Sequence, residues 1–272
     1  MLPDPKDPAP DEPEETEGGE PVEGSEPVEG VEPLEGGELL ESEVPEFAAL
    51  PLPSLDELAA ALAWAFTGEE VPPGYLERCA EHALLVQTKN RVMNLTKIVT
   101  PRDIAAKHYL DCFRAARFLP LMGRAILDVG SGAGYPGIPI ALQEPNTRVV
   151  LLDSTQKKAE FLKESIATMK LTNVKAFGER AEDHLIKNHY DVVVMRAVSS
   201  VRENVRTLRM VRHSLRDLVM LKGPSWSREV KAGEREAERL GFKLDTVWEY
   251  ALPEEIGKRA VLVYRAPGGQ GR

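Results

Sequence analysis

The chain of 272 residues contains only two cysteines and no long hydrophobic run. Its longest apolar segment, residues 58–66, is far shorter than the roughly 20 residues that a membrane-spanning helix needs. The N-terminal sequence has neither the basic start nor the apolar stretch of an export signal. We therefore expect a cytoplasmic protein with no membrane partner, in which Cys79 and Cys112 are reduced core residues.

Metal-ligating patterns are also missing. The five histidines show no metal spacing with cysteine or carboxylate partners: His82, His108, His184, His189 and His213. Structural and catalytic zinc sites need several such ligands at short, regular spacing. The sequence therefore predicts no metal site.

Positive charge is almost absent from the first 53 residues. They hold 17 Asp and Glu and one Lys, a net charge of −16, whereas residues 54–272 carry +6. Residues 19–36 repeat a six-residue unit that contains Pro and Gly in each copy. Dense glutamate opposes collapse, and such a repeat cannot propagate a helix. We expect residues 1–53 to form an acidic disordered tail.

Three helices are expected over residues 54–122. Ser54 and Glu57 have the spacing of a capping box at the first helix. A second helix follows Pro72 and Pro73, and a third begins with Thr100 as N-cap and Pro101 at its first position. This part should form an N-terminal helical cap.

After residue 122 short β-rich runs alternate with helical segments. The expected strands are at 125–130, 148–153, 174–178, 190–197 and 217–223, and the chain ends in a hairpin of 242–252 and 259–266. A helix with Ser154 as N-cap fills 154–170. Nearly continuous apolar strands are typical of parallel sheets covered on both faces. Residues 123–272 should therefore form a doubly wound, Rossmann-like α/β sheet with a C-terminal antiparallel hairpin.

A glycine loop follows the first expected strand, with glycines at 130, 132, 134 and 137. No Gly-Lys-Ser/Thr follows, so a P-loop is excluded. The spacing satisfies the dinucleotide pattern, and Asp153 stands 19 residues after Gly134, where an acid would bind a ribose diol. Asp128, however, would repel a pyrophosphate and suits a cationic ligand head. S-adenosylmethionine fits the loop best, with NAD as the open alternative.

Several ordered motifs resemble the bacterial RsmG (GidB) methyltransferases, over roughly residues 75–265. The segments that carry the resemblance are NLT (94–96), HYLD (108–111), LDVGSGAGYPGIPIA (127–141), LLDSTQKKAEFL (151–162), RAED (180–183), VVMRAVSS (193–200) and LKG (221–223). The departures are Tyr135, where an apolar ring is commoner, Cys112, where Ser is usual, and the acidic tail. The resemblance implies an S-adenosylmethionine-dependent enzyme that acts on guanine N7 in small-subunit ribosomal RNA.

The resemblance also implies roles for particular residues. Gly130 and Tyr135 would line the methionine side of the cofactor, Asp153 would bind the ribose, and Ala181 and Glu182 would lie along the adenine. Arg196 would border both cofactor and substrate. The alternatives are a strand-end ion pair for Arg196 and an ordinary helix N-terminal carboxylate for Glu182.

Strand positions agree with this assignment. Asp128, Asp153, Arg196 and Lys222 all fall at the carboxyl ends of expected parallel strands, where open α/β sheets bind ligands. With them, Gly130, Gly132 and Gly134 form the expected cofactor loop. We place Arg196 and Lys222 at the reaction centre as the candidate catalytic residues.

The expected strand end at 190–197 narrows the chemistry. It lacks the Asn/Asp-Pro-Pro-aromatic signature of amine methylation, and neither cysteine follows a strand end, as carbon methylation would require. Guanine N7 needs neither device, because its lone pair lies in the ring plane and it has no proton to remove. A cation against the guanine edge would oppose the charge that the purine gains, so we place Arg196 on a phosphate or on the cofactor.

A basic stripe is expected on a helix over 201–216. At 100° per residue its arginines fall within an arc of about 120°: Arg202, Arg206, Arg209, Arg212 and Arg216. One-sided charge favours contact with RNA phosphates, and an ordinary solvated helix face is the alternative. The acidic tail is then either a solubility element or a mimic that competes with RNA.

The sequence therefore predicts a methyltransferase of guanine N7 in small-subunit ribosomal RNA, acting on naked RNA or on the assembling subunit. One alternative is a methyltransferase for transfer RNA or a protein. The other is a nucleotide-binding module without transfer activity.

Overall fold

The computed structural model describes residues 49–253 and 256–269. The described residues belong to one compact unit, Glu43–Arg272. The predicted acidic tail lies outside the described residues except for its last five positions. The domain limits drawn after residues 53 and 122 remain predictions.

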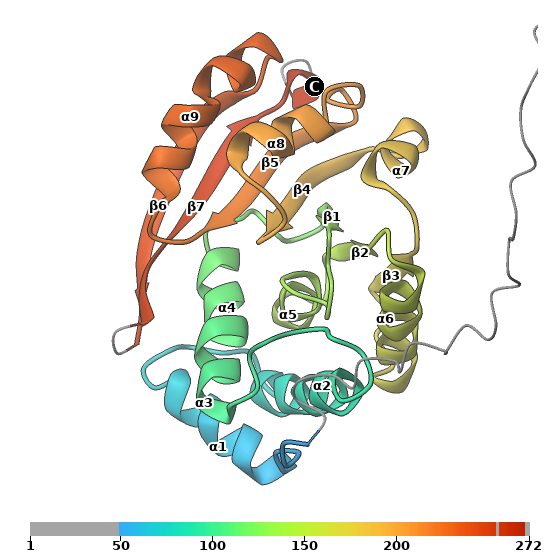
Figure 1. Cartoon of the computed structure of the whole chain (residues 1–272), viewed down its shortest axis with the longest axis vertical. Coiled ribbons are helices and arrows are strands. Elements are labelled where there is room, and N and C mark those ends of the chain that lie inside the picture. The colour runs from blue at the N-terminus through green and yellow to red at the C-terminus, as the bar shows by residue number, and fades with distance from the viewer. Residues whose placement is uncertain (1–48, 254–255, 270–272) are drawn as a thin grey trace, which may run out of the picture. The chain divides into compact units, whose positions relative to one another are not determined.

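The described unit is built on a seven-stranded sheet of order β3-β2-β1-β4-β5-β7-β6 (Figure 1). The strands are β1 (Ala125–Val129), β2 (Arg148–Leu152), β3 (Val174–Phe177), β4 (Tyr190–Arg196), β5 (Leu215–Lys222), β6 (Lys243–Leu252) and β7 (Gly257–Arg265). Strands β1 to β5 are parallel, and β6 and β7 form an antiparallel hairpin that pairs with β5. The predicted doubly wound α/β fold is confirmed, and the predicted strands agree to within three residues.

Helices precede and separate the strands. The cap holds α1 (Leu55–Ala65), α2 (Tyr75–Asn90), α3 (Pro101–Asp103), η1 (Ile104–Leu110) and α4 (Asp111–Ala116). The sheet carries α5 (Gly137–Gln143), α6 (Gln156–Thr168), α7 (Ala181–Lys187), α8 (Val201–Thr207), α9 (Trp226–Arg239) and η3 (Pro267–Gly269). The capping box of Ser54 and Glu57 and the Thr100 cap are confirmed. The cap of α6 was misplaced by one residue, because Thr155 and not Ser154 stands at its N-cap.

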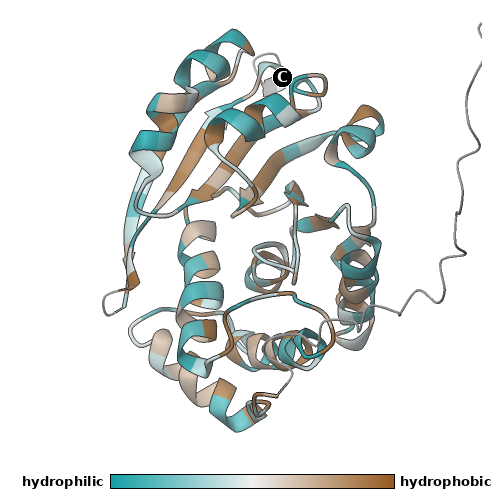
Figure 2. Cartoon of the chain, viewed as in Figure 1, coloured by the Kyte–Doolittle hydropathy of each residue, from teal (hydrophilic) through white to brown (hydrophobic). Residues whose placement is uncertain are grey.

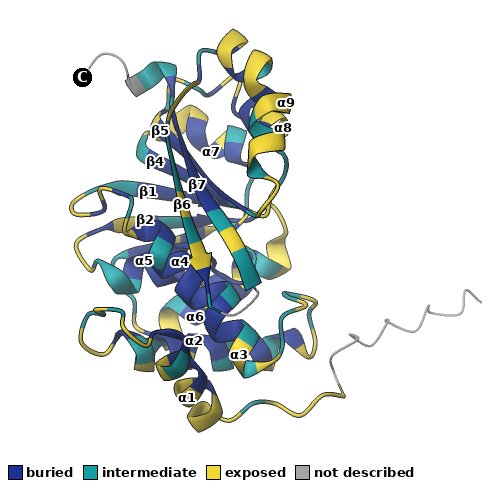
Figure 3. Ribbon diagram, turned by 90° about the vertical axis from the view of Figure 1, so that its left-hand side faces the viewer, coloured by how far each residue is buried: buried dark blue, intermediate teal, exposed yellow. Residues whose placement is uncertain are grey.

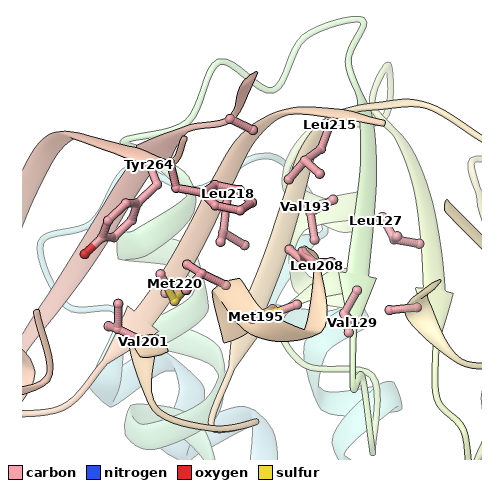
Figure 4. Packing of buried hydrophobic residues seen from close by; sticks show 14 of the residues in the cluster. Leu127, Val129, Val193, Met195, Val201, Leu208, Leu215, Leu218, Met220 and Tyr264 are labelled. Carbon is pink, nitrogen blue, oxygen red and sulfur yellow. The ribbon is translucent and has the colours of Figure 1, made fainter. Parts of the chain in front are cut away.

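Alternate strand residues enter two separate cores. Leu127, Val193 and Leu218 face a cluster that also contains side chains of α7, α8 and α9 (Figure 4). Their neighbours Ile126 and Val192 face the opposite cluster, which α4, α5 and α6 complete. Figure 3 shows the inner strands mostly buried between these layers, whereas the edge strand β6 is largely exposed or half-buried and the outer side of α9 is exposed. Coverage on both faces explains why the parallel strands are apolar at nearly every position.

A third cluster joins the cap to the sheet. It is formed mainly by side chains of α1, α2, η1 and α4, and it includes Tyr135 of the glycine loop, Phe161 of α6 and Leu252 of β6. Apolar residues are frequent along β4, β5 and β7 (Figure 2), and the cap helices bury apolar residues such as Leu58 and Ala83 in this cluster. Residues 104–110 form a π-helix, an uncommon geometry that is frequent at functional sites.

The predicted helix over 201–216 is wrong beyond its first half. Helix α8 ends at Thr207, turns follow, and β5 starts at Leu215. Leu208 and Leu215 are buried in the core beside Val193 and Met195 (Figure 4). Pairing of Leu215 with Tyr190 of β4 extends the sheet, and this long-range pairing overrides the local helical periodicity.

Candidate active site

The glycine loop joins the end of β1 to the start of α5. Gly130, Gly132 and Gly134 have φ values of 73°, 58° and 99°, which residues with a Cβ rarely adopt. The N–H groups of Gly130 and Ser131 donate to the carbonyl of Leu152 at 2.8 and 3.1 Å. The loop is therefore tied to the end of the neighbouring strand β2.

Asp128 lies fully buried beneath this loop. Its Oδ2 accepts a hydrogen bond of 2.9 Å from the N–H of Gly137, at the first turn of α5. Its Oδ1 is buried without a hydrogen-bond partner. Burial raises the pKa of the Asp128 carboxyl to about 7. Oδ2 thus helps to fix the conformation of the loop, a role that the sequence did not indicate. Oδ1 remains able to accept a hydrogen bond from a cationic group.

Asp153 follows β2 and also holds the loop. Its Oδ2 accepts from the N–H of Gly132 at 3.0 Å, and its Oδ1 accepts from the N–H of Thr155 at 2.9 Å. Each carboxylate oxygen has two acceptor sites, so both oxygens keep capacity for a ligand hydroxyl. Two main-chain N–H groups therefore fix the orientation of Asp153, the residue predicted to bind the ribose.

The two residues that are predicted to lie along the adenine follow β3. Ala181 is buried at the first position of α7, and Glu182 beside it is half-buried. Since β1, β2 and β3 are adjacent, the predicted cofactor residues at their ends share one edge of the sheet. This edge borders the point between β1 and β4 where the strand order reverses, which is where open α/β sheets bind ligands.

Tyr135 turns its ring into the cap. The ring stacks on His108 of η1 with centroids 4.2 Å apart, and its hydroxyl donates to the Tyr109 hydroxyl at 3.0 Å. Burial together with the charge of Arg196 holds the pKa of His108 well below its usual range. Only 7% of Tyr135 is exposed, so its hydroxyl serves the cap and not the open side of the loop.

Arg196 stands at the end of β4 and is held by the cap. Its guanidinium lies 3.3 Å from Asp111 Oδ2 and donates to the main-chain carbonyl of Lys107. Asp111 also accepts a 2.8 Å hydrogen bond from the Tyr250 hydroxyl and lies 3.8 Å from Arg259. Asp111 ends the motif HYLD, but no role for it follows from the sequence. Nothing in the sequence points to Tyr250 or Arg259, because these partners come from distant elements.

Lys222 ends β5 and is also paired. Its ammonium lies 2.8 Å from Glu229 of α9 and donates to the carbonyl of Ser199. Arg196 and Lys222 line one hollow of about 570 Å³. Its other walls include Asp111, Ser199, Ser200, Gly223, Pro224, Glu229 and Arg259. The two predicted catalytic residues are therefore brought together, each beside a carboxylate.

Val198 separates this hollow from the glycine loop. A Cβ built on Gly130 would lie 2.8 Å from Val198 Cγ2, so the side chain covers that glycine directly. Val198 also lines the hollow, and Ala197 before it has φ 53°. Residue 198 is thus the boundary between the two predicted binding regions, and the sequence did not single it out.

The predicted RNA-binding arginines do not form one stripe. Only Arg202 and Arg206 lie on α8, and Arg206 pairs with Glu236 of α9 at 3.0 Å. Arg209 donates to the carbonyl of Arg206 at 3.2 Å, and Arg212 donates to that of Arg209, both from the turns after the helix. Their role in binding RNA stays a prediction, without the helical geometry that motivated it.

Over 49–253 and 256–269 no helix is long and apolar enough to cross a membrane. Within the same ranges no group of three or more His, Cys, Asp or Glu could hold a metal ion.

The family model and the related proteins that match this chain carry the same description. Residues 76–255 match the family model GidB, described as rRNA small subunit methyltransferase G. A ribosomal RNA small subunit methyltransferase G from Solibacter usitatus is 38% identical over 189 residues, which cover 68% of this chain and 88% of that protein. The protein of the same name from Carboxydothermus hydrogenoformans is 32% identical over 185 residues, covering 66% and 79%. Among solved structures, M. capricolum TrmK in complex with S-adenosyl-homocysteine has a TM-score of 0.46 and 14% identity, covering 57% of this chain and 67% of that chain.

Proposed function

The chain belongs to the GidB family, rRNA small subunit methyltransferase G, and from this premise we propose that it methylates N7 of a guanine in small-subunit ribosomal RNA. S-adenosylmethionine is the methyl donor. The partner is the small-subunit RNA or the assembling subunit, and we place the reaction in the cytoplasm, where that substrate is made. The observation that carries the proposal is the hollow of Arg196 and Lys222, separated from the glycine loop by the single side chain of Val198.

The residues around the glycine loop fit S-adenosylmethionine. Asp128 Oδ1 is a buried acceptor without a partner, which suits a cationic ligand group. Asp153 has free acceptor capacity for ribose hydroxyls, and Ala181 and Glu182 stand where the adenine would lie. Gly132 leaves room along the backbone for the ligand, whereas Gly130 is covered by Val198 and Gly134 by Ile138 and His82. When bound, this cofactor supplies an electrophilic methyl group on a sulfonium.

The chain's own residues have little proton chemistry to perform on guanine N7, because N7 offers a lone pair without a proton. Their task is to align the base and to exclude water, as proximity accounts for much of such a rate enhancement. Val198 and the main chain around Ser199 bound the space in which the base would lie. Arg196 and Lys222 would orient the RNA backbone or the cofactor.

Charge neutralisation fits the same reaction. The purine gains the positive charge that the sulfonium loses, so an unpaired cation beside the base would raise the barrier. Arg196 is paired with Asp111 and Lys222 with Glu229. Each cation can therefore contact a phosphate without presenting full positive charge to the purine edge.

The predicted division into parts completes the proposal. Residues 54–122 form the cap, and residues 123–272 carry both binding regions except for Asp111, which the cap contributes to the hollow. Residues 1–53 act either as a solubility element or as a competitor of RNA. Deleting residues 1–53 and comparing RNA affinity at low and at physiological salt separates these two roles, since exposed electrostatic contact is screened over about 10 Å at 0.1 M salt.

The test is nucleoside mass spectrometry of unmethylated small-subunit RNA and of unmethylated small subunits after incubation with the protein and S-adenosylmethionine. The proposal expects 7-methylguanosine in at least one of the two substrates. Methylation of transfer RNA or protein only would favour another methyltransferase activity. Binding of NAD but not of S-adenosylmethionine would favour a nucleotide-binding module and overturn the proposal.

A further inference from the structure

A hydrogen-bonded chain of three cap and loop side chains begins and ends on the glycine loop. The Tyr135 hydroxyl contacts the Tyr109 hydroxyl at 3.0 Å, and that hydroxyl contacts His82 Nδ1 at 2.9 Å. His82 Nε2 in turn lies 3.0 Å from the carbonyl oxygen of Ala133. Tyr135 and Ala133 belong to the loop, whereas Tyr109 and His82 belong to η1 and α2 of the cap.

Only one arrangement of protons satisfies this chain. The Ala133 carbonyl can only accept, so His82 Nε2 must carry a proton. Burial lowers the pKa of His82 to about 4, so the ring is neutral near pH 7 and its Nδ1 accepts. Tyr109 must then donate to His82, and Tyr135 must donate to Tyr109. A buried network in which every group has one role is rigid, because any rearrangement leaves a polar group unpaired.

The cap also touches the loop between these two anchor points. Gly134 lies between Ala133 and Tyr135 and has φ 99°. A Cβ placed on Gly134 would lie 3.1 Å from His82 Nε2, so the imidazole packs against the loop backbone. His82 is fully buried, and its ring lies 5.2 Å from that of Tyr135. The curvature of the loop is thus set from outside the predicted methyltransferase domain.

We propose that His82 is a positioning residue for cofactor binding: it donates to Ala133 and, through Tyr109, holds Tyr135, and so keeps the glycine loop in its binding conformation. This inference rests on the proposed function, since it assigns the loop to S-adenosylmethionine. It makes cofactor affinity a property of the cap as well as of the sheet. His82 does not contact the predicted reaction centre, so the rate at saturating cofactor should not depend on it.

The test compares variants of the full chain by calorimetry with S-adenosylmethionine and by methyl transfer to small-subunit RNA. His82→Phe removes both hydrogen bonds and should weaken cofactor binding about tenfold or more, the usual effect of a lost buried hydrogen bond, with kcat at saturating cofactor unchanged. His82→Gln keeps an N–H donor at the same number of bonds from Cβ and should recover most of the affinity. Tyr135→Phe should weaken binding by a smaller factor.

Tyr75→Phe is the matched control. Tyr75 is a buried cap tyrosine whose hydroxyl has no hydrogen-bond partner, so its loss should leave cofactor affinity unchanged. If His82→Phe fails to fold, nitrogen NMR of the wild-type protein provides the second measurement. A proton on His82 Nε2 is expected, and a proton on Nδ1 instead would overturn the proposal.

Two failures can be told apart. A wild-type protein that does not bind S-adenosylmethionine contradicts the proposed function. A wild-type protein that binds it, together with a folded His82→Phe variant of equal affinity, contradicts only the positioning role. Equal loss of affinity in His82→Gln and His82→Phe would also overturn it, because the donated hydrogen bond would then have no effect.

Discussion

At the ends of β1, β2 and β3 the predicted cofactor residues are glycines and carboxylates, whereas at the ends of β4 and β5 the hollow is lined by cations. The first group lies within residues 128–182 and is held mainly by main-chain N–H groups. The second group consists of Arg196, Lys222 and Arg259, whose carboxylate partners come from α4 and α9. The first group forms a backbone-shaped region, which depends on the close packing of atoms around its main chain. The second forms a charge-paired region, which depends on its ion-pair partners. The two should therefore respond differently to substitution.

The largest effect is expected from adding a methyl group to the backbone-shaped region. In Gly137→Ala the new Cβ would lie 2.8 Å from Asp128 Oδ2 and closer still to Leu151 Cδ2, both of which are packed. We expect a loss of about 1–3 kcal/mol in stability and no measurable cofactor binding. Thermal unfolding and calorimetry test this. Gly223→Ala in the hollow is the control, since nothing lies within 4 Å of its Cβ, and equal damage in both variants would contradict the comparison.

Asp153→Ala removes a carboxylate from the same region. We expect S-adenosylmethionine to bind about 1.5–3 kcal/mol more weakly, through loss of a charge-assisted hydrogen bond and of the support for Gly132. RNA affinity should not change. Calorimetry measures the effect, with Asp183→Ala on the exposed side of α7 as control. Unchanged cofactor affinity would remove Asp153 from the site.

Asp111→Asn breaks the ion pair with Arg196 in the charge-paired region. Asn keeps an oxygen for the Tyr250 hydroxyl but removes the negative charge that holds Arg196. We expect kcat to fall about tenfold while cofactor affinity stays unchanged, the reverse of the Asp153 result. Single-turnover kinetics and calorimetry on one preparation test the split. A cofactor defect as large as that of Asp153→Ala would mean that the two regions are not separate.

Asp128 makes cofactor binding sensitive to pH. Its pKa is raised to about 7 by burial, and only the ionised carboxylate attracts a cationic ligand. Affinity should therefore rise about tenfold between pH 6 and pH 8 and then level off. Stability of the free protein should change in the opposite sense, falling as the pH rises from about 4 to 7, because the folded state binds this proton more tightly than the unfolded state.

Calorimetry across this pH range on wild type and Asp128→Asn tests the effect, and the variant should show a flat profile. At saturating cofactor the methyl-transfer rate should show no such rise, because N7 needs no general base. A rate that rises with pH and loses this dependence in one carboxylate or histidine variant would contradict the proposed chemistry.

The smallest effect concerns surface arginines. Arg202 is exposed on α8, whereas Arg206 is paired with Glu236. If Arg202 contacts a single-stranded phosphate, Arg202→Ala should lower the slope of log affinity against log salt by about 0.7. Arg206→Ala should lower it less, because Glu236 already compensates that charge. Equal slopes in all three proteins would assign α8 to an ordinary solvated surface.

The regions also differ in how far the sequence could predict them. The strand ends and the glycine loop are local patterns, and residues 128–182 contain nearly all of the predicted cofactor residues. The ion-pair partner of Arg196 was missed because Asp111 lies 85 positions before it, and Tyr250, which is hydrogen-bonded to Asp111, lies 54 positions after Arg196. The prediction of an arginine stripe was wrong because it continued the helical periodicity through Leu208 and Leu215. In the structure both residues are buried in the core of the sheet, outside α8.

His82 and Val198 show a second limit. His82 belongs to no recognisable motif, and Val198 lies in the motif of residues 193–200 but no role for it follows from the sequence. The contacts of both residues with the glycine loop are visible only in the structure. A lone buried histidine in a helix predicts nothing until its acceptor is known. The backbone carbonyl of Ala133 is such an acceptor, and carbonyl directions are not readable from residue types.

The hydrogen bond from Tyr250 to Asp111 has a consequence for the order of folding. It joins residues 139 positions apart, and a contact of such large sequence separation forms only after a long loop has closed. During synthesis the cap and β1 to β5 leave the ribosome before β6, and the carboxylate that holds Arg196 lacks its tyrosine until the hairpin has emerged and paired. The surroundings of Arg196 are therefore among the last parts of the protein to be completed.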